Sequence, residues 1–153
     1  MAIRNIVTLG DDVLTKKCRT VEKFDDRLCS LIEDLFDTLY KSGGAGLAAP
    51  QVGVLRRAAV IDLGDDPIEL VNPEIIYTEG NQTGAEGCLS NPGKFGMVTR
   101  PQKVTVKAQD RFGKWHEYTG EDLLARAFCH ETEHLDGKMF MDLVTEWIEV
   151  EED

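Results

Sequence analysis

Two histidines set one turn of helix apart constrain the fold more than any other feature of this sequence. His130 and His134 bracket the stretch "HETEH", and Glu131 directly follows the first of them. Apolar residues between 121 and 135 recur at helical spacing, which predicts a helix over this range. Residues four apart stack on the same face of a helix, so both imidazoles are expected to point to one side.

That face of the predicted helix is suited to binding a metal. Two imidazoles one turn apart can hold one small divalent cation, and a residue one position further on lies about 100° around the helix axis. Glu131 is therefore poorly placed as a ligand but well placed to move a proton beside the metal. The alternative is a pair of surface histidines, but the apolar run "LLARAFC" just before His130 favours an inward-facing pair.

A complete metal site needs a third ligand, and two regions of the chain offer one. Zincin peptidases supply it downstream, but only 19 residues follow His134 and none is histidine. The downstream candidates are carboxylates of a short acidic ending: Asp136, Asp142, Glu146 and Glu149. We favour Cys88 in "GAEGCLSNPG", although taken alone it reads more simply as a buried apolar thiol. A thiolate with two imidazoles leaves a tetrahedral position open for water, as catalytic sites do.

The rest of the chain predicts an α+β fold. Leucine and isoleucine recur every three or four residues between 25 and 41, which indicates an amphipathic helix ended by Gly43 and Gly44. Short β-like runs cover 57–63, 68–73, 74–80, 103–110 and 114–119, and the last two form a hairpin. The stretch "GAGLAAPQVG" is too rich in glycine and proline for regular structure. Strands that do not alternate with helices favour α+β over βαβ units.

Length and composition set the remaining bounds. The 153 residues fit a single catalytic domain over 1–153, with a solvated, frayed acidic tail from about 145 to 153. A net charge of −11 disfavours direct binding of nucleic acid. No run reaches the length of a membrane helix and no secretory signal opens the chain, so we expect a cytoplasmic protein. In that compartment the four cysteines are expected to remain thiols.

Three motifs together resemble those of the peptide deformylases, in that family's order and spacing. They are "GAGLAAPQ" at 44–51, "EGCLS" at 86–90 and "HETEH" at 130–134. The stretches "VTRPQKVTVKAQDRFGK" and "LDGKMFMDLV" extend the resemblance over nearly the whole chain. The resemblance implies short antiparallel sheets packed around a central helix that carries the two histidines. It also implies an enzyme that removes the formyl group from the N-terminal formyl-methionine of new bacterial or organellar polypeptides.

The resemblance also assigns roles to individual residues. Cys88, His130 and His134 would hold the metal, which lowers the pKa of its water so that hydroxide attacks the formyl carbon. Glu131 would take the proton of the water and pass it to the leaving amine. The side-chain amide of Gln51 and the backbone N–H of Leu89 would stabilise the oxyanion. Without the resemblance to the family, Gln51 would be interpreted as an ordinary loop glutamine.

The substrate and the metal follow from the same resemblance. Gly46 is expected to hydrogen-bond the substrate backbone like an added strand. Phe95, Leu123 and Ala127 are candidates for the methionine pocket, with plain core packing as the alternative. A thiolate with imidazoles suits iron, zinc, cobalt or nickel. The family implies Fe2+ in the cell, with Zn2+, Ni2+ or Co2+ in purified protein. The partners would be nascent chains and, transiently, the ribosome.

The sequence departs from the family pattern at three places. Glu133 stands where the family often has aspartate, and we expect it to form an ion pair with Arg100. Cys129 stands where glutamine is common; it adds a thiol that is either prone to oxidation near the metal or made inert by burial. The acidic C-terminus does not match the basic C-terminal helix with which some members dock on the ribosome.

Two other functions compete with deformylation. A zincin-like peptidase would need a downstream third ligand, so replacing Cys88 would leave its metal content unchanged. A metal-binding or ribosome-associated protein without activity would be expected to have lost Glu131, Gln51 or a ligand, and this chain keeps all of them. The absence of a transit segment favours a bacterial over an organellar protein.

Overall fold

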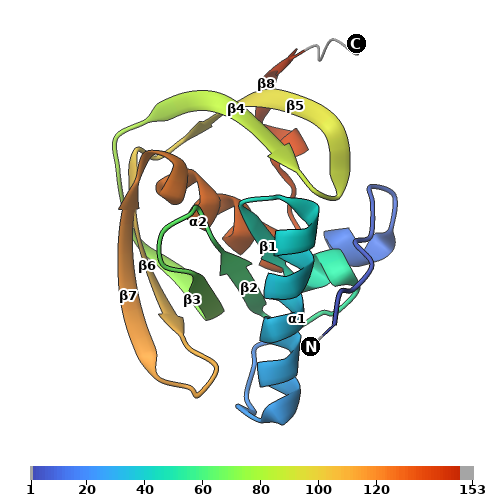
Figure 1. Ribbon diagram of the computed structural model, residues 1–153. Helices are drawn as coiled ribbons and strands as arrows, with labels where there is room; N and C mark the ends of the chain where they lie inside the picture. Colours follow the sequence, from blue (N-terminus) through green and yellow to red (C-terminus); the bar gives the residue numbers. More distant parts are fainter. Residues whose placement is uncertain (1, 149–153) are drawn as a thin grey trace.

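The computed structural model describes residues 2–148, which form two antiparallel sheets around a central helix (Figure 1). The five-stranded sheet has the order β1 (Gly46–Ala48), β2 (Ala58–Ile61), β3 (Ile68–Glu79), β6 (Lys103–Gln109) and β7 (Trp115–Glu121). The three-stranded sheet has the order β4 (Gln82–Cys88), β5 (Asn91–Arg100) and β8 (Val144–Ile148). The helices are α1 (Asp26–Ser42) and α2 (Asp122–Leu135), with 3-10 turns at Asp12–Thr15, Ala49–Val52 and Phe140–Leu143. The predicted α+β class is confirmed.

Helix α1 begins and ends where its sequence predicts. The Asp25 side chain accepts a hydrogen bond from the Leu28 backbone N–H at 3.1 Å, and Gly43 ends the helix with a φ of 75°. Its apolar stripe is buried against β1, β2 and β3 in one core cluster: Leu28, Leu31, Ile32, Leu35 and Leu39 against Leu47, Ala58, Val60 and Val71. This packing fixes the position of the glycine-rich segment that follows the helix.

Helix α2 is the central helix, and it confirms the prediction for 121–135. In Figure 1 it lies between the concave face of the five-stranded sheet and the three-stranded sheet. Ala125 and Phe128 are fully buried and belong to the same core cluster as Val104 and Val106 of β6. Polar side chains on a helix that is buried on most sides need hydrogen-bond or ionic partners. The histidines and the glutamate of α2 are therefore expected to have such partners around them.

The long strand β3 differs from its prediction. The sequence predicted separate runs at 68–73 and 74–80, but Ile68–Glu79 is one strand with two register shifts against β6. Asn72 sits at the first shift with a φ of 52°, and its side-chain amide donates to the Val21 carbonyl at 2.9 Å. The bulge bends the strand without ending it. The predicted hairpin of 103–110 with 114–119 is confirmed by β6 and β7.

Three strands, β1, β4 and β5, were missed because their glycines lower the predicted β-propensity. "GAGLAAPQVG" was predicted to be irregular, yet it contains β1 and a 3-10 turn. Strands β4 and β5 carry glycines that a larger residue could not replace. A β-carbon at Gly87 would lie 2.7 Å from the Phe95 ring, and one at Gly96 would lie 2.6 Å from Val144. Close cross-strand packing therefore outweighs the low β-propensity of glycine here.

The first residues of the acidic ending, 145–148, are more ordered than the sequence predicted. A frayed tail was expected from about 145, but Val144–Ile148 forms β8, which pairs with β5. The Trp147 ring also contacts Phe140, with ring centroids 6.1 Å apart. Residues 149–153 lie outside the described part of the chain. The four cysteines are thiols, as predicted. No helix within residues 2–148 is both long and apolar enough to cross a membrane.

Candidate active site

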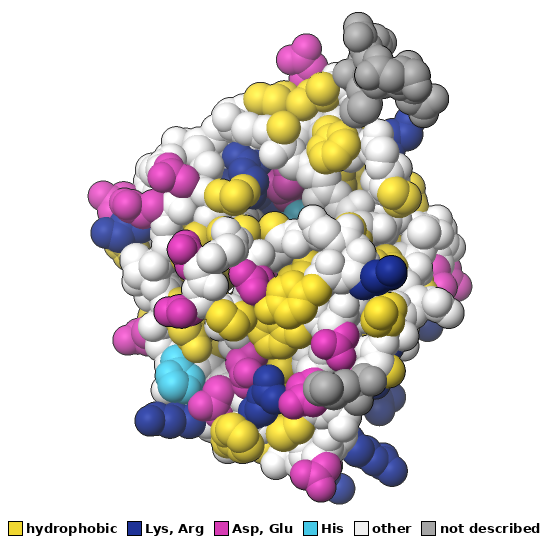
Figure 2. All heavy atoms as spheres, in the orientation of Figure 1, with side chains coloured by type: hydrophobic (Ala, Val, Ile, Leu, Met, Phe, Trp, Pro, Cys, Tyr) yellow, Lys and Arg dark blue, Asp and Glu magenta, His cyan; other side chains and the backbone are white. Residues whose placement is uncertain are grey.

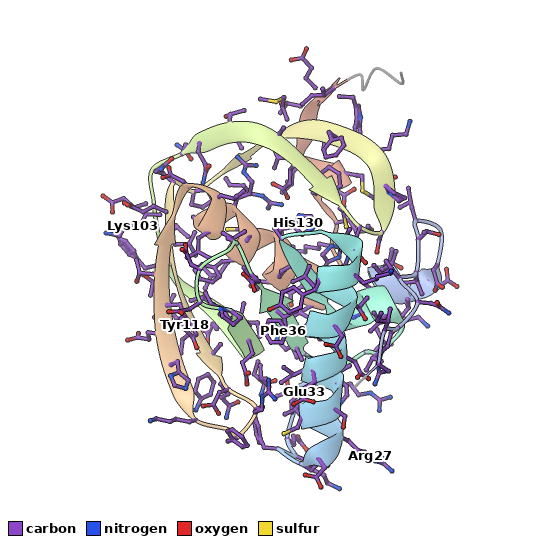
Figure 3. All side chains as sticks on the ribbon, in the orientation of Figure 1. Arg27, Glu33, Phe36, Lys103, Tyr118 and His130 are labelled. Carbon is purple, nitrogen blue, oxygen red and sulfur yellow. The ribbon has the colours of Figure 1, made fainter. Side chains whose placement is uncertain are left out.

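Helix α2 brings its two histidines together, as their spacing predicts. The Nε2 atoms of His130 and His134 are 3.1 Å apart, and their ring centroids are 4.8 Å apart. Both residues are buried. They point to the interior below the β4–β5 hairpin, where His130 is labelled in Figure 3. The alternative of two surface histidines is wrong.

Cys88 joins the histidines from the end of β4. Its Sγ lies 3.3 Å from His134 Nε2, and the candidate ligand atoms of Cys88, His130 and His134 all lie within 4.8 Å of one another. Cys88 occupies an irregular position in the β4–β5 pairing, just after Gly87. Among residues 2–148 this is the one group of three histidine, cysteine or acidic side chains close enough to share a cation. One thiolate and two imidazoles form a ligand set that suits a transition-metal cation.

Glu86 fixes the orientation of His130. The Nδ1 atom of His130 lies 2.5 Å from Glu86 Oε1, so the opposite nitrogen, Nε2, faces Cys88 and His134. A carboxylate behind a histidine in this way sets the tautomer and the ring orientation of a metal ligand. This role of Glu86 was not predicted, although the residue opens the motif "EGCLS".

Two buried arginines hold Glu86 in turn. Arg100 donates to it from Nε at 3.2 Å and from Nη2 at 2.7 Å, and Arg126 donates from Nη1 at 2.8 Å. Burial alone would raise the pKa of Glu86, but the hydrogen bonds from His130 and Arg100 outweigh it and lower the pKa to about 2. Glu86 is therefore an anion at neutral pH, and it gives the interior a fixed negative charge beside His130.

The predicted ion pair of Glu133 with Arg100 is confirmed. Arg100 Nη1 donates to both carboxylate oxygens of Glu133, at 2.5 and 2.7 Å. Arg100 thus bridges Glu133 on one side and Glu86 on the other. The neighbouring Cys129 is buried, and burial raises the pKa of its thiol to about 11. Its burial and its raised pKa support the inert alternative for this thiol.

The protonation of the two histidines differs because their surroundings differ. Burial alone would lower the pKa of His130, but its contact with Cys88 and the charges of Glu131 and Glu86 raise it to about 10. Burial and the neighbouring His130 hold the pKa of His134 well below its usual range. The negative charges that raise the pKa of His130 also favour the binding of a divalent cation beside it.

Glu131 is buried beside the cluster. Burial raises its pKa to about 7, and its Oε1 atom has no hydrogen-bond partner among residues 2–148. The other oxygen, Oε2, lies against Gly46 of β1: a β-carbon at that glycine would be only 2.6 Å away. A carboxyl group with a pKa near neutrality, fixed in the interior, can both accept and return a proton.

Gln51 is held with its amide toward Cys88. Its Oε1 accepts a hydrogen bond from the Ala48 backbone N–H at 2.9 Å, so the amide cannot be reversed without losing that bond. Its Nε2 lies 3.4 Å from Cys88 Sγ and 3.2 Å from Ser90 Oγ. Gln51 is fully buried, unlike an ordinary loop glutamine. The amide is a donor that is already oriented toward the cluster.

A cavity of about 410 Å³ opens in front of these groups. Figure 2 shows the hollow, with histidine, basic and acidic side chains at its bottom and hydrophobic side chains around it. All but one of the predicted site residues line it: Gly46, Gln51, Cys88, Leu89, Phe95, Leu123, Ala127, His130 and Glu131. His134 lies behind this wall and is almost fully buried. Leu123 and Phe95 are 57% and 41% exposed, which places them at the mouth rather than in the core.

A cysteine and two histidines that can share one cation, with a buried carboxyl group beside them and an apolar cavity in front, define a candidate centre of the metallohydrolase class. Comparisons with known proteins identify the family. Residues 3–148 match the polypeptide deformylase family. The chain belongs to the peptide deformylase family, as its motifs predict, and is therefore an enzyme.

Individual relatives cover nearly the whole chain. A peptide deformylase of Caldicellulosiruptor bescii is 58% identical over 152 residues, which are 99% of this chain and 92% of that protein. The crystal structure of a peptide deformylase from Legionella pneumophila has a TM-score of 0.91 and 50% identity, and covers 94% of this chain and 87% of the other. That of the enzyme from Thermotoga maritima has a TM-score of 0.92 and 38% identity, and covers 95% of this chain and 99% of the other.

Proposed function

We propose that this enzyme hydrolyses the N-formyl group of formyl-methionine at the start of new polypeptides, with a divalent cation held by Cys88, His130 and His134. The observation that carries this proposal is the convergence of the three ligand atoms within 4.8 Å, beside a buried Glu131 and at the inner end of a cavity. Such a cation lowers the pKa of a bound water and so supplies hydroxide at neutral pH.

Glu131 supplies the proton transfers in this proposal. Its carboxylate takes a proton from the attacking water while the water oxygen bonds to the formyl carbon. The same group then gives the proton to the amine nitrogen as the carbon–nitrogen bond breaks, so the products are formate and a free N-terminus. The raised pKa of Glu131, about 7, suits a group that must work in both directions near neutral pH.

Gln51 and Leu89 are proposed to stabilise the oxyanion. The Gln51 amide is oriented toward Cys88 by its bond from Ala48, and Leu89 directly follows Cys88 on the cavity wall. Donors that are fixed before the reaction stabilise developing charge without reorganising. Both lie on segments that the fold holds in place.

The substrate backbone is proposed to bind along β1. This strand is the edge of the five-stranded sheet, paired with β2 on one side only, and Gly46 belongs to both the strand and the cavity wall. An extended peptide can add to such an edge as a further strand. The N-terminal side chain would then enter the cavity between Phe95, Leu123 and Ala127.

Among the described residues no downstream side chain joins the two histidines as the third ligand that the zincin-like alternative needs, and the candidate Glu149 lies outside that range. Within residues 2–148 the histidines share their cluster with Cys88, and the downstream Asp136 is engaged by Arg57 at 2.7 Å. We propose ferrous iron as the metal in the cell, with zinc, nickel or cobalt as substitutes in purified protein. A bacterial cytoplasmic location with nascent chains as substrates, and a transient contact with the ribosome, completes the proposal.

The test is deformylation of formyl-Met-Ala-Ser by protein purified anaerobically with ferrous iron, beside Glu131→Ala. We expect the wild type to release formate and the variant to release none while it still binds metal. A Cys88→Ala variant with unchanged metal content would favour the peptidase alternative. No formate from fully metallated wild type would favour an inactive binding protein.

A further inference from the structure

The two residues proposed to stabilise the oxyanion come from different sheets. Gln51 lies in the 3-10 turn Ala49–Val52, which follows β1 of the five-stranded sheet. Leu89 lies between β4 and β5 of the three-stranded sheet. Within residues 2–148 no strand pairing joins the two sheets, so other contacts must set the separation of these donors. This separation matters for the rate, because a displacement of about 1 Å at a reacting group is costly.

The N-terminal segment contacts both regions through its backbone. The Val7 N–H donates to the Gln51 carbonyl at 2.8 Å, and the Leu9 N–H donates to the Ser90 carbonyl at 2.8 Å. Both acceptors belong to buried residues, whose side chains also meet, with Gln51 Nε2 at 3.2 Å from Ser90 Oγ. The N–H of the intervening Thr8 makes no hydrogen bond within residues 2–148. The two bonds therefore tie one stretch of chain to both sheets.

Helix α1 anchors the other end of this segment. The Arg4 N–H donates to Thr38 Oγ1 at 2.9 Å, and Arg4 Nε donates to Asp34 Oδ2 at 2.9 Å. Both acceptors lie on buried residues of α1. Residues 4–9, dark blue in Figure 1, thus run from α1 to the two regions that carry the oxyanion donors. A segment fixed at each end can restrain what it connects.

We propose that residues 7–9 are a positioning strap, whose two backbone hydrogen bonds hold Gln51 and Leu89 at the separation that the oxyanion requires. The bond from Val7 fixes the turn from which the Gln51 amide extends, and the bond from Leu9 fixes the residue after Leu89. Neither Val7 nor Leu9 lines the cavity, so the strap acts through the donors and not on the substrate. Donors fixed in advance stabilise charge without reorganising. The inference rests on the proposed function, to which these donors belong.

The test replaces one backbone N–H by an ester oxygen, which removes the donor and keeps every side chain. Cys18 allows the full chain to be assembled by native ligation of a synthetic segment 1–17 to residues 18–153. In the Val7 ester we expect kcat for formyl-Met-Ala-Ser to fall by about tenfold, with KM and metal content unchanged, because the oxyanion forms only during the reaction. A bond that served folding alone would lower the melting temperature and leave the kcat of the folded enzyme unchanged.

The Thr8 ester is the matched control, and its kcat should equal that of the all-amide chain assembled in the same way. The Leu9 ester should lower kcat as the Val7 ester does. Equal kcat in the Val7 and Thr8 esters would overturn the proposal. If an ester chain fails to fold, Val7→Pro, which lacks the same N–H, beside Thr8→Pro decides it by the same comparison. Absence of formate from the recombinant wild type would instead overturn the proposed function itself.

Discussion

The carboxyl group of Glu131 lies so close to Gly46 that the glycine can carry no side chain: a β-carbon there would be 2.6 Å from Oε2. We therefore predict that Gly46→Ala displaces Glu131 and lowers kcat. A displacement of about 1 Å at a reacting group can cost about a hundredfold in rate, so a loss between tenfold and a hundredfold is expected. Metal content, measured by elemental analysis, should stay at the wild-type level.

Gly96→Ala is the control for this prediction, because Gly96 is crowded by Val144 rather than by a site residue. It should lower the melting temperature through the β5–β8 contact and leave kcat unchanged. If Gly46→Ala retained full kcat, Glu131 would not need its observed position.

Glu86 is predicted to be required both for metal affinity and for stability. In Glu86→Gln the anion behind His130 is lost, and we expect metal affinity to fall by about tenfold to a hundredfold. The change also leaves the buried charges of Arg100 and Arg126 with fewer partners, which should cost about 3 kcal/mol of the free energy of unfolding. Chelator competition and urea denaturation measure the two effects.

The comparison variant is Glu69→Gln, since Glu69 pairs with Arg111 at a partly exposed position where both side chains are 20% exposed. Its effect on stability should be below about 1 kcal/mol, and its metal affinity should equal that of wild type. Equal effects of the two substitutions would show that the Glu86 cluster has no special role.

The sequence predicts the site better than it predicts the sheets. Helix α2 could be derived because its periodicity and its histidine spacing agree, and local signals of this kind do not depend on the rest of the fold. Strands β4 and β5 were hidden because their glycines lower β-propensity. Only the contact of Gly87 with the Phe95 ring shows why those glycines are there.

The side chains around the candidate metal ligands could not be predicted from the sequence either. Cys88 and the histidines are 42 or more positions apart, yet their types suggested a shared cation. Glu86 and Arg126 carried no such signal, because a glutamate in a loop motif and an arginine on a helix are ordinarily solvated. Their burial follows from the docking of β4 on α2, which no local pattern encodes.

Cysteine reactivity should depend on pH in a way set by burial. Burial raises the pKa of Cys18 to about 11, and this residue is 5% exposed, whereas Cys29 is only half-buried. Iodoacetamide at pH 8 should therefore modify Cys29 and spare Cys18, as peptide mass spectrometry would show. Both should react in denaturant. The neutral thiol of Cys18 is favoured by the fold, so its contribution to stability is complete below pH 9 and is lost as pH rises towards 11.

Removal of the metal should affect stability as well as activity. A cation that binds the folded chain alone stabilises it by about 4 kcal/mol when its free concentration is a thousand times its dissociation constant. We therefore expect a chelator to abolish formate release and to lower the melting temperature. Ferrous iron, the metal proposed for the cell, should restore both.

Two variants separate binding from catalysis in this experiment. Glu131→Ala keeps the three ligands, so its melting temperature should fall on chelation as much as that of wild type, although it is inactive with metal. His134→Ala removes a ligand that is almost fully buried behind the cavity wall, so its melting temperature should respond little to chelator. A full response of His134→Ala would mean that the cation is held elsewhere, and the cluster with Cys88 would lose its proposed role.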